Sequence, residues 1–173
     1  MPHSNAKTRK ILAAYQKIGN ELITLKTLPE LMDKILEITR AVFHFDNAVM
    51  RLVNKGGATL EVAASYGYPP EVLKEPLTFG QGIMGRAAAN GTPVVVADVC
   101  NDPDYLPGIP SARSAVVVPM VVQDRLVGVF NVESVEANAF TEDDVEVLQT
   151  MTAQAASAIE NARMYEEAEQ MSE

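Results

Sequence analysis

Residues 114–134, SAVVVPMVVQDRLVGVFNVES, decide the fold of this chain. Two runs rich in valine, residues 114–122 and 126–134, flank the polar triplet Gln123-Asp124-Arg125. Runs of this length and composition favour β-strands, and a short polar break between them is typical of a hairpin turn. The chain therefore contains an antiparallel hairpin, and the remaining elements have to pack around it.

A second hairpin is predicted upstream. Residues 47–54 alternate in the manner of a strand, and residues 60–65 form the returning run. The turn Asn54-Lys55-Gly56-Gly57 lies between them and contains residue types that accept a positive φ. Tyr68-Pro69-Pro70 then closes the hairpin.

Segments with helical periodicity precede and follow the two hairpins. Apolar residues within 8–27 recur at alternating spacings of four and three, as along a coiled-coil seam. A second helix follows the Leu28-Pro29 joint, and a third begins after Thr141, a natural N-cap, and continues to residue 165 or beyond. Because terminal helices must cover one face of an antiparallel sheet, we predict an α+β sandwich whose other face is covered by the irregular middle of the chain.

The middle of the chain contains a glycine-rich segment, GQGIMG at residues 80–85. It lacks the Gly-Lys-Ser/Thr ending of a P-loop and does not lie in a βαβ unit, so phosphate binding of that type is not predicted. Backbone freedom at the start of a short helix ending at Gly91 is the simpler role. The alternative is that the N-terminus of this helix points inward and binds an anion. A short strand at 94–96 and a loop over 98–112 follow.

Five linked pieces of sequence resemble the GAF family over about residues 28–165. Each piece alone is short, and their order and spacing carry the resemblance. They are GQGIMG at 80–85, VAD at 96–98 with DPDY at 102–105, SARS at 111–114 with VVVPM at 116–120, VGVFNV at 127–132, and FTEDD at 140–144 with AIENA at 158–162.

This resemblance implies a GAF/PAS-like fold: a central antiparallel sheet of five or six strands with terminal helices packed on one face, and loops plus short helices covering a small-molecule pocket on the other. We divide the chain into an N-terminal helical extension (1–27), the GAF domain (28–165) and the end of a signalling helix (166–173). Helices of this family commonly form dimer bundles.

Strand alternation points to a pocket independently. Leu126, Gly128, Phe130 and Val132 share one apolar face, which suits the helix layer. The opposite face carries Val127 and Val129, then Asn131 and Glu133, and so presents an amide and a carboxylate to the irregular middle. The alternative is that these two residues only approach the solvated end of the strand. Arg51 is likewise either a pocket cation or an exposed hairpin charge.

Two sets of candidate residues follow from these arguments. The candidate ligand-binding residues are Arg51, Phe79, Gly82, Ile83, Met84, Asp98, Tyr105, Arg113, Ser114, Val116, Val129, Asn131 and Glu133. The candidate dimer-helix residues are Ile11, Tyr15, Ile18, Leu22 and Leu25 near the N-terminus and Ala155, Ile159 and Ala162 in the last helix.

Composition excludes several classes of protein. A net charge of -9 and a pI near 4.7 argue against a nucleic-acid binder, which needs a basic face. No run approaches the ~18 apolar residues of a membrane span, and the N-terminus lacks the apolar run of a signal peptide. Cys100 is the single cysteine, so no disulfide forms within the chain. We therefore expect a cytoplasmic protein without membrane insertion.

Free methionine-(R)-sulfoxide reductase is the sharpest enzymatic alternative, because it is GAF-like and its pocket resembles residues 80–85 and 128–134. Its chemistry needs a nucleophilic and a resolving cysteine. In this chain Met84 occupies one of the reductase's cysteine positions, and Pro110 or a neighbour occupies another. Cys100 corresponds to neither position. As a redox sensor, Cys100 would need a lowered pKa, which nearby Asp98 and Asp102 oppose. We therefore expect no enzymatic activity.

The sequence does not match the motifs by which related domains bind other cofactors. The motif of cyclic-nucleotide-binding GAF domains needs a lysine where Val132 stands and a glutamate where Val145 stands. A covalent tetrapyrrole needs a cysteine that is typically beside a histidine, but Cys100 precedes Asn101. His44, at a helix end, is more simply structural than a metal ligand. The cofactor is therefore unknown, with no metal and no covalent chromophore expected.

The sequence thus predicts a sensory GAF module in a homodimer. It would bind an unidentified small molecule and relay binding through the terminal helices to a fused or separate output domain, such as a histidine kinase, a nucleotide cyclase or a transcriptional regulator. The alternative is a structural dimerisation module whose pocket is filled by its own side chains.

Overall fold

The computed structural model describes Arg9, Leu12, Ala13, Gln16 and residues 27–172 of the chain. The N-terminal seam residues Ile11, Tyr15, Ile18, Leu22 and Leu25 lie outside the described residues, so their role in a dimer stays a prediction.

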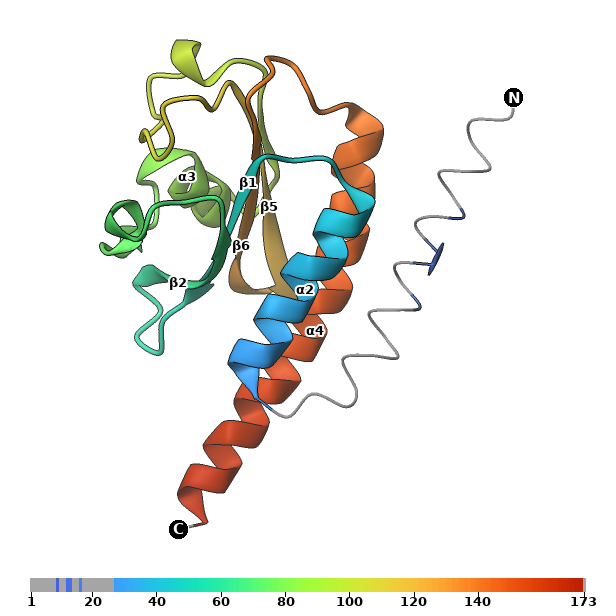
Figure 1. Cartoon of the computed structure of the whole chain (residues 1–173). Coiled ribbons are helices and arrows are strands. Elements are labelled where there is room, and N and C mark those ends of the chain that lie inside the picture. Colours follow the sequence, from blue (N-terminus) through green and yellow to red (C-terminus); the bar gives the residue numbers. More distant parts are fainter. Residues whose placement is uncertain (1–8, 10–11, 14–15, 17–26, 173) are drawn as a thin grey trace.

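One antiparallel sheet with the strand order β3-β2-β1-β6-β5-β4 forms the centre of the domain. Helices α2 and α4 lie side by side on one face, whereas α3 and the longer loops cover the other (Figure 1). This is the predicted α+β arrangement, and the sheet has six strands where five or six were expected. The strands are β1 (Asn47–Val53), β2 (Thr59–Tyr66), β3 (Leu77–Thr78), β4 (Val94–Val96), β5 (Ser114–Val122) and β6 (Arg125–Ser134). The helices are α2 (Leu28–Val42), α3 (Gly82–Asn90) and α4 (Glu142–Met171), with 3-10 turns η1 (Pro70–Leu73) and η2 (Val99–Asn101).

Local sequence explains where the helices begin and end. The Thr27 hydroxyl accepts the amide of Glu30 at the start of α2. At the start of α4, Thr141 and Asp144 form a reciprocal capping box, in which each side chain accepts the other residue's backbone N–H. Helix α3 ends at Gly91, which adopts φ 68°. Within the described residues, no helix is both long and apolar enough to span a membrane.

The β5–β6 hairpin turns through only two residues. Gln123 and Asp124 have φ of 49° and 62°. Two consecutive positive φ values give the turn that matches the right-handed twist of the flanking strands. Strand β6 therefore begins at Arg125, one residue before the start that the sequence predicts.

A β-bulge at Val127 changes the face that the start of β6 presents. Met120 pairs with Gly128, but the next residue, Val121, pairs with Leu126, so Val127 is an extra residue in β6. Val127 consequently packs in the helix-side core and Leu126 on the opposite face. The predicted alternation therefore holds from Gly128 to Glu133 and is wrong for the two residues before it.

Two apolar layers sandwich the sheet. The helix-side core includes Phe130, which is fully buried, and Met50 of β1. The opposite layer gathers Leu60, Val117 and Val129 beneath α3. The second layer is the smaller one and leaves space beside it for a cavity.

The packing of α4 corrects one prediction about the dimer helices. Ala155 and Ile159 are 1% and 0% exposed and belong to the helix-side core of their own chain, and Ala162 packs against the same core. The apolar seam of this helix therefore covers the sheet of its own chain. A second helix would have to approach α4 on another face.

Candidate functional site

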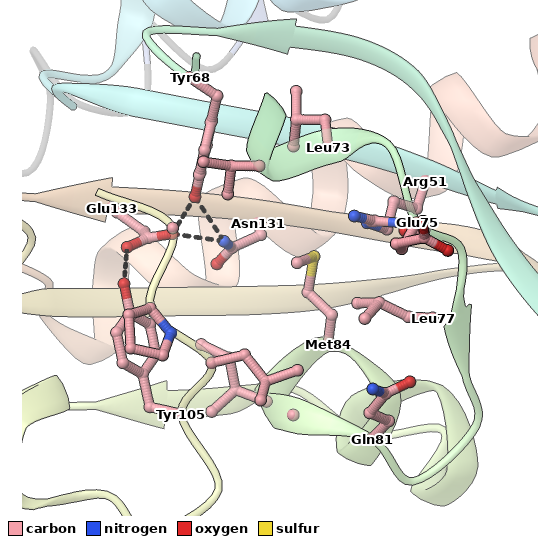
Figure 2. Close-up of a pocket in the computed structure, with 16 residues that line it drawn as sticks. Arg51, Tyr68, Leu73, Glu75, Leu77, Gln81, Met84, Tyr105, Asn131 and Glu133 are labelled. Atoms are coloured by element: carbon pink, nitrogen blue, oxygen red, sulfur yellow. Dashed lines mark hydrogen bonds between the residues drawn. The ribbon is translucent and has the colours of Figure 1, made fainter. Parts of the chain in front are cut away.

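A cavity of about 220 Å³ lies between the sheet and the loops on the face opposite α2 and α4 (Figure 2). Strands β1 and β6 contribute its sheet wall, and the first turn of α3, the segment from η1 to β3 and the loop at 105–108 enclose it. Its lining consists of Arg51, Tyr68, Val72, Leu73, Glu75, Leu77, Gln81, Gly82, Ile83, Met84, Tyr105, Leu106, Pro107, Gly108, Asn131 and Glu133.

The carboxylate of Glu133 marks one end of the cavity. Glu133 is only 2% exposed, yet three side chains donate hydrogen bonds to it. Tyr105 Oη donates to Oε2 at 2.8 Å, and Asn131 Nδ2 donates to Oε1 at 2.9 Å. The Tyr68 hydroxyl also donates to Oε1, as the dashed lines in Figure 2 show. A buried carboxylate is tolerated when donors satisfy its oxygens in this way.

The two tyrosines are held in the protonated, donating form. Burial raises the pKa of both Tyr68 and Tyr105, and the negative charge of Glu133 raises each pKa further. The two side chains come from different loops, at residue 68 after β2 and at residue 105 after η2. Glu133 therefore joins two covering loops to the sheet.

Arg51 marks the other end of the cavity. It is 3% exposed, and its Nη1 donates to the carbonyl oxygens of Leu60 and Glu75, each at 3.1 Å. Its Nε is buried without a hydrogen-bond partner. Among residues 27–172, no carboxylate forms an ion pair with this guanidinium, and burial lowers the pKa of Arg51. Arginine nevertheless stays protonated in proteins, so the group is a buried cation.

Asn131 lies between these two charges. Asn131 pairs with Val49 of β1. Two residues before it on β6, Val129 pairs with Arg51. Two residues after it comes Glu133. Two residues span about 7 Å along a strand, so the amide stands midway along the sheet wall. Its Oδ1 is buried without a partner. The cavity thus presents a carboxylate, an amide and a guanidinium in a row.

Apolar side chains form the wall that faces this polar row. Met84 of α3 and Leu77 of β3 point into the space on the Arg51 side, with Leu73 across from them (Figure 2). Gly82 allows the helix to start here, because it adopts φ +67° and a Cβ would lie 3.0 Å from Leu106 Cδ1. The glycine-rich segment therefore has the backbone role that its sequence predicts.

The structure brings about half of the predicted ligand-binding residues to the cavity. Arg51 lies in the wall and is buried, so it is the pocket cation of the two alternatives and not an exposed hairpin charge. Asn131 and Glu133 are buried as well and do not lie at a solvated strand end. The predicted residues that line the cavity are Arg51, Gly82, Ile83, Met84, Tyr105, Asn131 and Glu133.

The other predicted residues lie away from the cavity. Phe79 is 38% exposed, and Val116 packs in the helix-side core. Val129 is buried in the apolar layer beneath α3. The Ser114 hydroxyl donates to the carbonyl of Glu136 at 2.6 Å and so fixes the connection from β6 to α4.

Asp98 and Arg113 form an ion pair outside the cavity, with Arg113 Nη2 2.8 Å from Asp98 Oδ2. The hydrogen bond from Arg113 lowers the pKa of Asp98 to about 2, with help from the backbone amide of Cys100. The pair joins the two ends of the loop that carries Tyr105.

A second set of ion pairs fastens the same loop to α3. Arg86 Nη2 lies 2.9 Å from Asp102 Oδ2, and Arg86 Nη1 lies 2.7 Å from Asp104 Oδ2. The hydrogen bond from Arg86 lowers the pKa of Asp102. Tyr105 follows Asp104 directly, so these pairs position the tyrosine that reaches Glu133.

Sequence reasoning missed several lining residues, above all Tyr68. We interpret Tyr68-Pro69-Pro70 from sequence only as the end of a hairpin. Gly67 before it adopts φ +78°, and a Cβ there would lie 2.8 Å from the carbonyl oxygen of Asp46. The sequence contains no local signal for the role of Tyr68, because its partner Glu133 lies 65 residues away along the chain. The other lining residues that were missed are Val72, Leu73, Glu75, Leu77, Gln81, Leu106, Pro107 and Gly108.

Cys100 is exposed on η2 and does not line the cavity. At the site itself, Met84 is the sulfur-containing side chain in the wall. Among the described residues, no three histidine, cysteine, aspartate or glutamate side chains gather as metal ligands would.

Known proteins share this architecture. The family model for the GAF domain matches residues 26–160. Protein YtsP of Bacillus subtilis is 33% identical over 72 residues, which is 42% of this chain and 44% of that protein, so the match spans less than half of the relative.

Two solved structures resemble the fold closely. The GAF domain of a phosphoenolpyruvate-protein phosphotransferase from Coxiella burnetii has a TM-score of 0.80 at 19% identity, over 90% of this chain and 96% of that one. Free methionine-R-sulfoxide reductase from Neisseria meningitidis, in complex with its substrate, has a TM-score of 0.77 at 24% identity, over 86% of this chain and 87% of that one. Since the family model covers well over half of the residues, the chain belongs to the GAF domain family.

Proposed function

We propose that this GAF domain is a sensory module that binds a small molecule in the cavity between Arg51 and Glu133 and does not transform it. The observation that carries the proposal is a cavity of about 220 Å³ whose sheet wall contains the buried side chains of Arg51, Asn131 and Glu133. Within the described part of the chain, no carboxylate forms an ion pair with Arg51, and a ligand that pairs with a buried charge recovers part of the cost of burying it.

The alternative is a structural module whose pocket is filled by its own side chains. A cavity of about 220 Å³ is larger than the engineered cavity of about 150 Å³ that holds benzene, which speaks for a ligand. The polar side chains along the sheet wall favour a ligand that has polar groups of its own.

A relay to the terminal helix is part of the proposal. Strand β1 carries Arg51 in the cavity wall, and two residues later the carbonyl of Val53 accepts a hydrogen bond from Arg163 Nη2 of α4 at 2.9 Å. The carboxylate of Glu166, also on α4, accepts the backbone amide of Leu28 at 3.0 Å. A shift of β1 on ligand binding would therefore move α4 and with it α2. We propose a cytoplasmic homodimer in which this movement reaches an output domain such as a kinase, a cyclase or a transcriptional regulator.

Sulfoxide reduction is the second candidate function, favoured by the similarity to the Neisseria enzyme. The reaction needs a thiolate to attack sulfur and a second thiol to release it. Cys100 is the chain's single cysteine and is exposed outside the cavity, and Met84 lies in the wall. These positions support binding without chemistry.

Native mass spectrometry of the purified full chain tests the proposal, with a denaturing run as its control. We expect a dimer that carries a non-covalent mass, which disappears on denaturation. A protein that never retains or takes up a small molecule, together with a cavity that stays dry, would support the structural module. Reduction of free methionine sulfoxide in the presence of a thiol reductant would overturn the assignment as a non-enzyme.

A further inference from the structure

We propose that the ligand is a small organic monoanion whose carboxylate pairs with Arg51 and whose apolar body lies against Leu77 and Met84. The inference deepens the proposed function and rests on it. It concerns the chemical class of the ligand, which the arrangement of charges in the cavity restricts.

Arg51 is a buried cation that has no counter-ion among the described residues and uses only part of its hydrogen-bonding capacity. A guanidinium has five N–H donors, and here Nη1 serves two backbone carbonyls while Nε has no acceptor. Its side chain lies in the cavity wall, 3% exposed, and no carboxylate of residues 27–172 forms an ion pair with it. A buried charge without a counter-ion is costly. A ligand carboxylate would supply that counter-ion at Nη2, because Nη1 already donates to two carbonyls and Nε is buried.

The other charges of the cavity restrict the charge of the ligand. Arg51 is the cation among the lining residues, whereas Glu75 and Glu133 are acidic. A dianion such as phosphate would meet one cation and two carboxylates, so electrostatics disfavours it. A cationic ligand could pair with Glu133, whose oxygens already accept hydrogen bonds from Tyr68, Tyr105 and Asn131. It could otherwise pair with Glu75, which would place the ligand cation beside the Arg51 guanidinium. A single negative charge at Arg51 is the arrangement that remains.

The apolar wall defines the rest of the ligand. Leu77 and Met84 lie on the same side of the cavity as Arg51 in Figure 2, and Leu73 lies opposite them. A ligand anchored at Arg51 therefore places its next atoms against aliphatic side chains. A short branched or cyclic hydrocarbon attached to a carboxylate fits this combination.

Isothermal titration calorimetry with three probes that share an isobutyl group tests the inference on the unmodified full chain. The probes are isovalerate, its neutral amide isovaleramide, and the cation isopentylamine, with inorganic phosphate as a fourth. Because a paired carboxylate gains a charge-assisted hydrogen bond that the amide lacks, we expect isovalerate to bind about tenfold more tightly than isovaleramide. We expect no saturable binding of the amine or of phosphate.

Two variants test whether Arg51 causes the preference for the carboxylate over the amide. Arg51→Gln should abolish the preference for isovalerate over isovaleramide. Glu61→Gln is the control, because it removes an exposed carboxylate of β2 that does not line the cavity, and it should leave the preference unchanged. If Arg51→Gln does not fold, as thermal unfolding would reveal, the comparison of probes on the unmodified chain decides alone.

The outcomes separate the inference from the function on which it rests. Saturable binding of the amide or the amine, with an isovalerate affinity that is equal or weaker, would overturn the carboxylate and leave a sensory cavity. Tighter binding of phosphate would overturn the monoanion in the same way. If none of the four probes binds at millimolar concentration while native mass spectrometry finds no retained mass, both the inference and the proposed function fail.

Discussion

Gly128 of β6 and Arg51 of β1 approach one another so closely that a Cβ on Gly128 would lie 2.2 Å from the carbonyl oxygen of Arg51. The same atom would lie 3.0 Å from Cε of Met120. The obstacle is backbone, so it cannot move aside as the end of a flexible side chain can. Gly128 also follows the bulge at Val127, and its missing side chain lets the two strands meet beside the cavity cation.

Gly128→Ala should therefore destabilise the domain by about 1–3 kcal/mol, as overpacked core positions do, and should displace Arg51. Urea unfolding measures the change. Gly56→Ala is the matched control, because a Cβ there would meet only the Asn54 side chain, at 3.7 Å, and should alter the free energy of unfolding by less than about 0.5 kcal/mol. Equal effects of the two substitutions would contradict the close contact.

Tyr105→Phe removes one donor from the buried carboxylate of Glu133 and keeps the ring. A hydrogen bond to a charged group contributes about 1.5–3 kcal/mol, so we expect a loss of this order in the free energy of unfolding. We also expect faster amide hydrogen exchange in the loop around residues 102–108. Tyr165→Phe is the control, since Tyr165 is 55% exposed on α4 and should tolerate the change. Unchanged loop exchange in Tyr105→Phe would show that the bond does not hold the loop.

Arg86→Gln breaks the two ion pairs that fasten the loop to α3. The Asp104 side chain is 54% exposed, so the loss in global stability should stay below about 1 kcal/mol. The local effect should be larger than the global one, with faster hydrogen exchange around Tyr105. Lys34→Gln, which removes an exposed i,i+3 pair with Glu37 on α2, should leave loop exchange unchanged. A large global loss would mean that Arg86 does more than hold the loop.

Acid should release the same loop. Hydrogen bonds from Arg113 and Arg86 lower the pKa of Asp98, to about 2, and that of Asp102. An unfolded aspartate titrates near pH ~3.9, so this stabilisation is complete above that pH and is lost as the pH falls toward about 2. NMR amide shifts of Tyr105 and Leu106 should therefore move in that acidic range. Asp98→Asn should remove the part of the shift due to Asp98, and an unaltered titration would contradict the assignment.

Thr141→Ala removes the Thr141 half of the capping box at the start of α4. Loss of an N-cap hydroxyl costs about 1 kcal/mol, and we expect that change in the free energy of unfolding. Thr150→Ala, on the exposed face of the same helix, is the control and should be neutral or slightly stabilising, because alanine has the higher helix propensity. A neutral Thr141→Ala would mean that the box adds nothing to the packing of α4.

Short-range chemistry explains what the sequence predicted well. The boundaries of β5, the cap at Thr141 and the end of α3 at Gly91 each depend on residues within one turn of the chain. Strand alternation from Gly128 onward correctly placed Asn131 and Glu133 on the face opposite the terminal helices.

Tertiary contacts explain what the sequence could not reveal. The bulge at Val127 depends on how β5 and β6 pair, and the alternation of β6 alone contains no sign of it. Tyr68 reaches Glu133 across 65 residues of sequence, and no local pattern specifies that partner. The seam with Ala155 and Ile159 has the spacing of a helix partner, yet the apolar surface that it meets is the sheet of its own chain.

The shared acceptor at Glu133 has a consequence for how fast the cavity exchanges its contents. Because Tyr68 and Tyr105 bond to different oxygens of one carboxylate, either tyrosine can release Glu133 while the other stays bonded. Breaking one such bond costs about 1.5–3 kcal/mol, and the loop of Tyr105 is held in addition by the ion pairs of Arg86 and Arg113. Molecules would therefore exchange mainly past Tyr68, while Tyr105 keeps one oxygen of the buried carboxylate bonded.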